Sequence, residues 1–294
     1  MNNRNIYNTA NFFWQGNLTP YEILCIKSFI KNDFYVNLWS YEQIDLNDLE
    51  DLENFTIKNA GIIMPKSYIN KFTQNSQKNN LSSFTNLFRY KLLNEFGGWW
   101  FDTDCICLKN VEEFNSLAKK YPFVIGETPE KLVNGSVMFF KDKIHMKNLI
   151  DSVEEKLDYQ SVNFEWGEIG PYLLTDYFKN KKTNYICSKN LFYEIGPKEF
   201  DILFSTNQKV VKSIEVRLGD AFVCHLWNEM YRRYLLDKYK LPPKGSKLNS
   251  WFKTYGIFPS KKYTPFVNLR FYQPLSYLFK VISRIKVLIK NISS

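Results

Sequence analysis

Apolar and polar residues follow one another in short blocks that predict strands and helices in turn. Residues 11–16 (NFFWQG) form an apolar run that predicts a strand ending at Gly16, and the alternating pattern of Phe34–Trp39 predicts a second strand. A helix through Lys31 lies between them, because Thr19-Pro20 supplies an N-cap followed by a proline at the first helical position. The order strand, helix, strand is typical of an α/β domain.

The same alternation continues downstream, without an internal repeat or a low-complexity linker. Residues 42–80 are polar and predict only short helices and a loop. The later elements are a helix over Val111–Lys120, strands over Phe123–Gly126 and Asn134–Phe140, a helix over Lys147–Leu157, and a helix from Gly170-Pro171 through Phe178. The pattern predicts one α/β domain with a sheet between helices.

The stretch Phe84–Asp104, FTNLFRYKLLNEFGGWWFDTD, is the most informative part of the chain. It begins with an amphipathic helical pattern, which Gly97 and Gly98 end because glycine readily adopts the left-handed conformation of a helix C-cap. The bulky apolar run Trp99–Phe101 then predicts a buried strand. Ligands of open α/β sheets bind beyond the carboxyl ends of the strands, so the residues after Phe101 are expected at a site.

Asp102 and Asp104 come directly after this strand. In extended chain, residues i and i+2 point the same way, so both carboxylates would face one ligand. Carboxylate oxygens suit Mg²⁺ or Mn²⁺, and a cation held by one or two carboxylates keeps positions that phosphate oxygens fill. The motif therefore predicts a metal-bound diphosphate, although a lone Asp-X-Asp elsewhere usually marks a solvated turn.

Arg89-Tyr90 together with Phe96–Asp104 resembles the DXD region of glycosyltransferase family 32. This family includes bacterial capsule and lipopolysaccharide sugar transferases, and the large clostridial glucosylating toxins are more distantly similar in their catalytic domain. The resemblance covers residues 11–235 in patches. It implies a GT-A fold (a Rossmann-like mixed sheet flanked by helices), a nucleotide-sugar donor with UDP-sugar favoured, Mn²⁺ or Mg²⁺, and retention of the anomeric configuration.

The resemblance also implies roles on the donor side. Trp14 and Trp100 would stack on the two sides of the nucleobase, although both tryptophans also suit a core. Arg89 would reach the donor sugar or phosphates, where an ordinary surface arginine is the alternative. Asn86 stands where the family usually has an aspartate that binds sugar hydroxyls, so the preference for a donor sugar is open.

The remaining implied residues lie later in the chain. His225, in a His-Leu-Trp triplet, would be the third metal ligand beside Asp102 and Asp104, and Trp227 would contact the diphosphate. The alternative for His225 is a capped core residue. Glu168 and Gly170 would lie on the acceptor side. Asn134, at the start of a strand, is expected to face either the acceptor or the anomeric carbon, and each of the three has an ordinary structural alternative. The sequence does not identify a protein nucleophile.

The charge distribution and the cysteine content limit the expected partners and cellular location of the protein. The net charge is +9, but 12 of the 39 basic residues lie in residues 238–294, which contain no acidic residue. Residues 1–237 therefore carry 27 basic and 30 acidic residues, which argues against nucleic acid as a partner. The odd count of five cysteines and the lack of an apolar leader predict reduced thiols in a cytoplasmic enzyme, with Cys105 and Cys107 as packing residues.

The charge boundary divides the chain into a GT-A domain, residues 1–237, and a basic C-terminal extension, residues 238–294. Apolar residues recur at helical spacing near its end: Leu278, Val281, Ile282, Ile285, Leu288, Ile289 and Ile292. A basic amphipathic helix predicts binding to an anionic membrane, here as a peripheral protein on the inner face of the cell membrane. A helix packed on the catalytic domain is the alternative.

Together these features predict a metal-dependent glycosyltransferase that moves a sugar to a glycan or lipid-linked glycan in capsule or lipopolysaccharide synthesis. Two other classes stay open at this point. A metal-dependent phosphoesterase also uses paired aspartates, but it usually needs a richer ligand set than the two histidines of this chain supply. A non-catalytic glycan- or membrane-binding protein on the same fold is the other.

Overall fold

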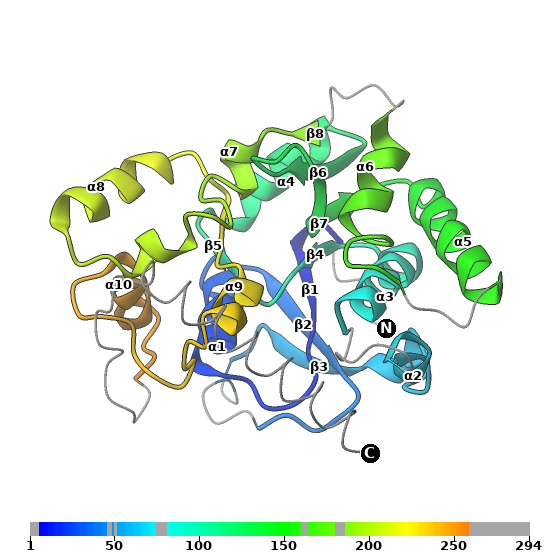
Figure 1. Cartoon of the computed structure of the whole chain (residues 1–294), viewed down its shortest axis with the longest axis horizontal. Coiled ribbons are helices and arrows are strands. Elements are labelled where there is room, and N and C mark those ends of the chain that lie inside the picture. Colours follow the sequence, from blue (N-terminus) through cyan, green and yellow to red (C-terminus); the bar gives the residue numbers. More distant parts are fainter. Residues whose placement is uncertain are drawn as a thin grey trace, which may run out of the picture. The chain divides into compact units, whose positions relative to one another are not determined.

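The structure is a computed structural model that describes residues 6–45, 49, 52–73, 81–159, 164–179 and 186–258 (Figure 1). The chain forms two compact units, Met1–Gly196 with Arg217–His225 and Pro197–Val216 with Leu226–Ser294. The boundary at residue 237 that the charge distribution predicts stays a prediction.

A seven-stranded mixed sheet forms the centre of the first unit, in the order β3-β2-β1-β4-β7-β6-β8. Its strands are β1 Thr9–Phe13, β2 Tyr35–Ser40, β3 Phe55–Asn59, β4 Trp99–Phe101, β6 Phe123–Glu127, β7 Val133–Phe140 and β8 Ile186–Cys187. The pairs among β3, β2, β1 and β4 are parallel, β7 runs antiparallel to β4 and β6, and β8 is parallel to β6. The predicted mixed α/β architecture is confirmed.

Helices pack against this sheet, as predicted (Figure 1). The helices of the first unit are α1 Pro20–Ile30, α2 Tyr68–Thr73, α3 Leu81–Phe96, α4 Val111–Lys120, α5 Ile144–Tyr159, α6 Pro171–Lys179 and α7 Lys189–Phe192. Thr19 caps α1 in a capping box with Glu22, and α3 ends at Gly97 and Gly98, whose φ angles of 65° and 85° lie in the left-handed region. The predicted start of α1 and end of α3 are therefore confirmed.

Strand β4 is buried on both faces because its side chains alternate. On one face Phe101 lies 4.2 Å from Phe29 of α1 and Trp99 lies 5.1 Å from Phe114 of α4, measured between ring centroids. On the other face Trp100 packs toward Phe88 of α3. Burial on both faces places the strand that leads to Asp102 and Asp104 within the core of the first unit.

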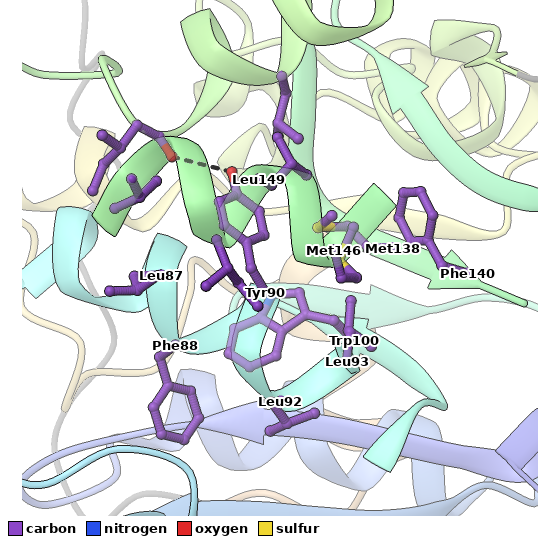
Figure 2. Packing of buried hydrophobic residues seen from close by; sticks show 14 of the residues in the cluster. Leu87, Phe88, Tyr90, Leu92, Leu93, Trp100, Met138, Phe140, Met146 and Leu149 are labelled. Atoms are coloured by element: carbon purple, nitrogen blue, oxygen red, sulfur yellow. Dashed lines mark hydrogen bonds between the residues drawn. The ribbon is translucent and has the colours of Figure 1, made fainter. Parts of the chain in front are cut away.

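Figure 2 shows the apolar cluster between α3, α5 and the sheet, where Leu93, Trp100, Met138 and Met146 lie close together. The Tyr90 hydroxyl donates to the carbonyl oxygen of Ile169 at 3.1 Å, the dashed line in the view. This hydrogen bond joins α3 to the loop that precedes α6. The helix that carries Arg89 is thus held by both apolar packing and a buried polar contact.

A polar side chain holds the three neighbouring strands β2, β1 and β4 together. Asn11 of β1 is 1% exposed, and its amide donates to the carbonyl oxygens of Gly97 and Trp99 at 3.3 and 3.1 Å. Its carbonyl oxygen accepts from the Trp39 indole of β2 at 3.0 Å. Every polar group of this buried amide has a partner, which stabilises the entry of the chain into β4.

A second, two-stranded sheet follows directly after the aspartates. Strands β5, Cys105–Cys107, and β9, Val223–His225, pair antiparallel, and Cys105 lies opposite His225 in the register. This short pairing brings residues from distant parts of the sequence to one place in the first unit.

The second unit contains the 3-10 helix Phe200–Phe204, most of α8 Gln208–Arg217, α9 Asn228–Arg233 and α10 Lys247–Thr254. Tyr231 is fully buried there and packs on the rings of Phe200 and Phe204. None of the described helices is long and apolar enough to cross a membrane. The amphipathic helix predicted over residues 278–292 lies outside the described residues.

Candidate functional site

Asp102 lies immediately beyond β4, and its backbone and side chain are both held. Its amide donates to the carbonyl oxygen of Ser136 in β7 at 2.9 Å. Its Oδ1 accepts from the Trp100 indole at 2.8 Å and lies 3.2 Å from the Arg89 guanidinium. One carboxylate oxygen therefore has two fixed donors, one neutral and one charged.

Arg89 is itself enclosed, with 6% of its surface exposed. Its guanidinium carbon lies 5.2 Å from the centre of the Trp100 ring, a cation–π contact. A Cβ atom added to Gly135 would lie only 2.7 Å from Nη1 of Arg89, so the glycine leaves the room that the guanidinium occupies. The cation is thus positioned by the strand on one side and by the β7 glycine on the other.

The surroundings of Asp102 shift the pKa of its carboxyl in opposite directions. Its partly buried position raises the pKa of the carboxyl above the ordinary value, the Arg89 guanidinium opposes this rise, and the neighbouring Asp104 carboxylate adds to it. The Asp102 side chain keeps 28% exposure, so solvent moderates all three influences. Two adjacent carboxylates that repel one another favour a cation between them.

The two aspartates do not lie in extended chain, so that part of the sequence argument was wrong. The Cys105 amide donates to the Asp102 carbonyl oxygen at 3.1 Å, which closes a turn between β4 and β5. The chain must turn here because β5 leaves the large sheet to pair with β9. Asp104 consequently faces a different neighbour, His225, whose Nε2 lies 3.5 Å from Asp104 Oδ1.

Asp104, Cys105 and His225 place one potential metal-binding atom each within 4.8 Å of one another. Among the described residues, this is the group of three or more such side chains that the structure brings together. The donor set fits a divalent cation, because Asp104 and His225 are 8% and 6% exposed, with potential ligand atoms 3.5 Å apart. Asp102 is not a member of this group, although its carboxylate interacts electrostatically with Asp104 and His225.

Trp100 does not have the surroundings that the sequence analysis expected. Its side chain is 1% exposed and belongs to the apolar cluster, so its ring has no open face for a nucleobase in this conformation. Its indole N–H instead orients Asp102. Trp14 is different: it follows β1, is half-buried, and its indole donates to the Asn17 carbonyl oxygen at 3.2 Å.

Asn86 and Gly170, predicted on the donor and acceptor sides, are in contact. A Cβ atom added to Gly170 would lie 2.5 Å from the Asn86 amide nitrogen, so only glycine lets this loop lie against α3. Glu168, in the same loop, forms an ion pair with Lys156 at 3.0 Å and accepts from the Glu165 amide. Of the predicted acceptor residues, Gly170 therefore lies beside α3, about one turn before Arg89, whereas Glu168 contacts Lys156 of α5.

Asn134 is part of a network that sequence reasoning missed. Its side-chain oxygen accepts from the Ser136 amide at 2.8 Å, and its backbone carbonyl oxygen accepts from the Tyr193 hydroxyl at 3.2 Å. The Ser136 and Tyr193 hydroxyls lie 2.8 Å apart. Burial raises the pKa of Tyr193, so it remains a protonated donor. No sequence motif marks Tyr193, and only the fold connects it with Ser136, whose carbonyl oxygen anchors Asp102.

Trp227 precedes α9 in the second unit and has a left-handed backbone with φ 60°. Such a conformation is uncommon outside glycine. Its contact with a diphosphate stays a prediction.

Residues 20–124 match the sequence family described as "Glycosyltransferase sugar-binding region containing DXD motif", which confirms the resemblance. No curated protein matches the chain. The structure is similar to that of the galactosyltransferase LgtC, solved with donor and acceptor sugar analogues. The match covers 86% of this chain and 98% of that chain, at 10% identity and a TM-score of 0.50. This likeness confirms the GT-A type of fold.

Two further solved structures are similar at lower TM-scores. PaToxG glycosyltransferase is 13% identical, with 72% of this chain and 74% of that chain covered and a TM-score of 0.42. Glycosyltransferase GlyE of Streptococcus pneumoniae TIGR4 is 15% identical, with 86% of this chain and 65% of that chain covered and a TM-score of 0.42.

Proposed function

We propose a donor, a metal and an acceptor for this chain, which is a glycosyltransferase with a GT-A fold. The donor is a nucleotide-sugar, with UDP-sugar favoured, and the metal is Mn²⁺ or Mg²⁺. The acceptor is a glycan or a lipid-linked glycan. The observation that carries the proposal is the convergence at the end of β4, where Arg89 contacts Asp102 and His225 faces Asp104.

Asp102, Asp104 and His225 would hold the cation. When bound, a divalent cation supplies Lewis-acid neutralisation of a diphosphate leaving group. Burial of Asp104 and His225 strengthens their interaction with any ion, because a protein environment screens charges less than water does.

Arg89 would add a second positive group at the leaving group. Its planar fork of donors suits phosphate oxygens, and its enclosure between Trp100 and Gly135 fixes the direction of those donors before substrate arrives. Asn86, three residues earlier on α3, would offer an acceptor and donors to sugar hydroxyls. Trp14 would stack on the base. Trp227 would donate its indole N–H to the diphosphate.

On the acceptor side we assign Asn134, Glu168 and Gly170, of which Gly170 contacts Asn86. The acceptor hydroxyl would attack the anomeric carbon from the face that the diphosphate leaves, and the leaving phosphate would take the acceptor proton. This route retains the anomeric configuration without a protein nucleophile. A role in capsule or lipopolysaccharide synthesis would require such a glycan acceptor.

The experiment that tests the donor proposal is calorimetry with UDP in the presence and absence of Mn²⁺. UDP should bind only with the metal, and nucleotide-sugars screened under the same conditions should show which one is slowly hydrolysed. The Trp14→Ala variant should bind UDP more weakly by about 1–3 kcal/mol, the scale of base stacking on an aromatic ring. Unchanged affinity with a lower melting temperature would show that Trp14 is a core residue.

The match of residues 20–124 to the DXD sugar-binding family supports glycosyl transfer over the phosphoesterase and the non-catalytic alternatives. The assay that separates the classes compares hydrolysis of nucleotide-sugars with hydrolysis of phosphomonoesters. Preferential hydrolysis of phosphomonoesters would overturn the donor proposal.

For the basic extension we propose a peripheral location on the inner face of the cell membrane. Four basic residues near the C-terminus would contact anionic headgroups: Lys280, Arg284, Lys286 and Lys290. Such residues contribute about 1 kcal/mol each near an anionic surface, and salt weakens them. A chain ending at Tyr272 should keep donor hydrolysis and lose binding to anionic liposomes. Equal liposome binding by both chains would remove the tail as the anchor, and aggregation would show that its apolar side packs on the protein.

A further inference from the structure

A sulfur atom lies in the candidate metal cluster, and the glycosyltransfer proposal does not use it. Cys105 begins β5, pairs with His225 of β9 in the register and is fully buried. Its Sγ, an Asp104 carboxylate oxygen and a His225 ring nitrogen all lie within 4.8 Å of one another. The sequence analysis assigned this thiol to packing, but its position makes it a neighbour of both predicted ligands.

The chemistry of this sulfur differs from that of the other ligands. Carboxylate oxygens suit Mg²⁺ and Mn²⁺, whereas thiolates select softer ions, and imidazole suits ions such as Zn²⁺. Cys105 would therefore add one soft ligand atom to a site whose other ligand atoms are a carboxylate oxygen and a ring nitrogen.

The present contacts of Cys105 leave its sulfur available. Its thiol lies 3.9 Å from the Ser136 carbonyl oxygen, a long and weak contact even for sulfur. The neighbouring thiol on the same strand is different, because Cys107 donates to the Lys109 carbonyl oxygen at 3.1 Å. Cys107 is equally buried but does not belong to the cluster of described residues around His225.

We propose that Cys105 is a sulfur ligand that lets the Asp104–His225 site bind a second class of ion, the thiophilic divalent cations Co²⁺, Zn²⁺ and Cd²⁺. On binding, the S–H bond breaks, a sulfur–metal bond forms and the proton leaves to solvent. The inference rests on the proposed function only in its choice of Asp104 and His225 as ligands.

This second class of ion would inhibit sugar transfer. Ions of the zinc type usually bind four ligands, so Asp104, Cys105 and His225 would leave at most one position for a diphosphate oxygen, and none if Asp102 also binds. Magnesium prefers six oxygen ligands and keeps several positions that substrate phosphates fill. Two diphosphate oxygens could therefore join Mg²⁺ or Mn²⁺ at this site, whereas a thiol-bound ion would accept at most one. Thiophilic ions would compete with the activating ion for the same two residues.

The test is spectroscopic and uses the full chain freed of metal. Titration with Co²⁺ should produce a sulfur-to-cobalt charge-transfer band in the near ultraviolet. Cys105→Ser should lose the band, and the matched Cys107→Ser should keep it. Cys105→Ser should also weaken Cd²⁺ binding by more than about tenfold, the lower end of the cost of losing even an outer-shell partner of a metal site. Mn²⁺ affinity, measured by electron paramagnetic resonance, should stay unchanged.

The same measurements separate this inference from the proposed function. Mn²⁺ binding that depends on Asp104, together with no cobalt–sulfur band, would overturn the inference and leave the proposed function standing. A cobalt–sulfur band without Mn²⁺ binding would support the inference and overturn the proposed Mn²⁺ site. If Cys105→Ser does not fold, ¹¹³Cd resonance on the wild-type chain decides, because a shift typical of nitrogen and oxygen ligands alone would exclude the sulfur.

Discussion

The two aspartates of the motif lie two residues apart but are held in opposite ways. Asp102 accepts from the Trp100 indole, and its carboxylate contacts the Arg89 guanidinium. Asp104 faces the His225 ring at 3.5 Å, which is longer than an ordinary hydrogen bond between nitrogen and oxygen. Trp100 and Arg89 therefore contact the first carboxylate, whereas the second lies beside an imidazole with which it could share an ion.

The largest effect is expected from a change of Asp104, the aspartate that faces His225. Asp104→Asn removes a negative charge and a proposed metal ligand, so we expect sugar transfer with Mn²⁺ to be abolished. The melting temperature should change little, because the carboxylate belongs to a turn rather than to the apolar core. Asp151→Asn, an exposed position on α5, is the matched control and should keep full activity.

Steady-state transfer measured beside a melting curve checks this prediction. Activity of Asp104→Asn within about tenfold of the wild type, roughly 1.4 kcal/mol in the barrier, would contradict the assignment of Asp104 to the metal.

A somewhat smaller effect should follow from a change on the Asp102 side. Arg89→Lys keeps the positive charge but removes the planar fork that contacts Asp102 and that we propose to bind a phosphate. We expect transfer to fall by about 100-fold, the scale seen when one preorganised donor is removed from an active site. Mn²⁺ affinity should change much less than in Asp104→Asn, because Trp100 still orients Asp102.

The matched control is Lys91→Met, two residues along α3, whose ammonium pairs with Glu154 instead. It should transfer sugar normally. If Arg89→Lys weakens Mn²⁺ binding as strongly as Asp104→Asn does, Asp102 and Asp104 do not have the different roles in metal binding that we infer.

The smallest effect is expected from removing a single hydrogen bond, the one from the Trp100 indole to Asp102. Trp100→Phe keeps an aromatic ring in the core and removes the indole N–H that donates to Asp102. Hydrogen bonds to charged groups contribute about 1.5–3 kcal/mol, so the free energy of unfolding should fall by that order, with some loss of packing added. Transfer should fall less than in Arg89→Lys.

Trp99→Phe provides the comparison, because Trp99 lies on the opposite face of β4 and its indole donates to the Tyr7 carbonyl oxygen at 3.1 Å. Both variants should lose stability in chemical denaturation, but only Trp100→Phe should alter transfer. Equal activity of the two variants would show that Trp100 only fills the core.

Local sequence signals predicted the part of the site that is local in sequence. The capping residue Thr19, the glycines after Phe96 and the apolar run before Asp102 each act over a few residues, and the structure confirms the elements that they predict. Alternation on β4 was less informative, because both faces of that strand are buried and every residue is apolar. The burial of Trp100 therefore could not be separated from an exposed stacking role.

The contacts of the site between residues far apart in the sequence could not be predicted from local signals. The turn that follows Asp102 exists because β5 pairs with β9, a partner that no pattern near Asp104 indicates. The place of Cys105 beside His225 depends on that pairing as well, as the network around Tyr193 depends on the neighbouring strand β7. His225 was found only through its resemblance to a family triplet.

The pairing of β5 with β9 also sets the order in which the site can be completed during synthesis. Helix α3 and strand β4 are neighbours in sequence, so Arg89 can meet Asp102 through a short loop. His225 comes 120 residues after Cys105, and closing so long a loop costs more chain entropy and is slow. A chain that emerges from the ribosome N-terminus first therefore carries Arg89 and Asp102 long before His225. It brings His225 to Asp104, the proposed metal site, only when the last strand of the first unit has docked.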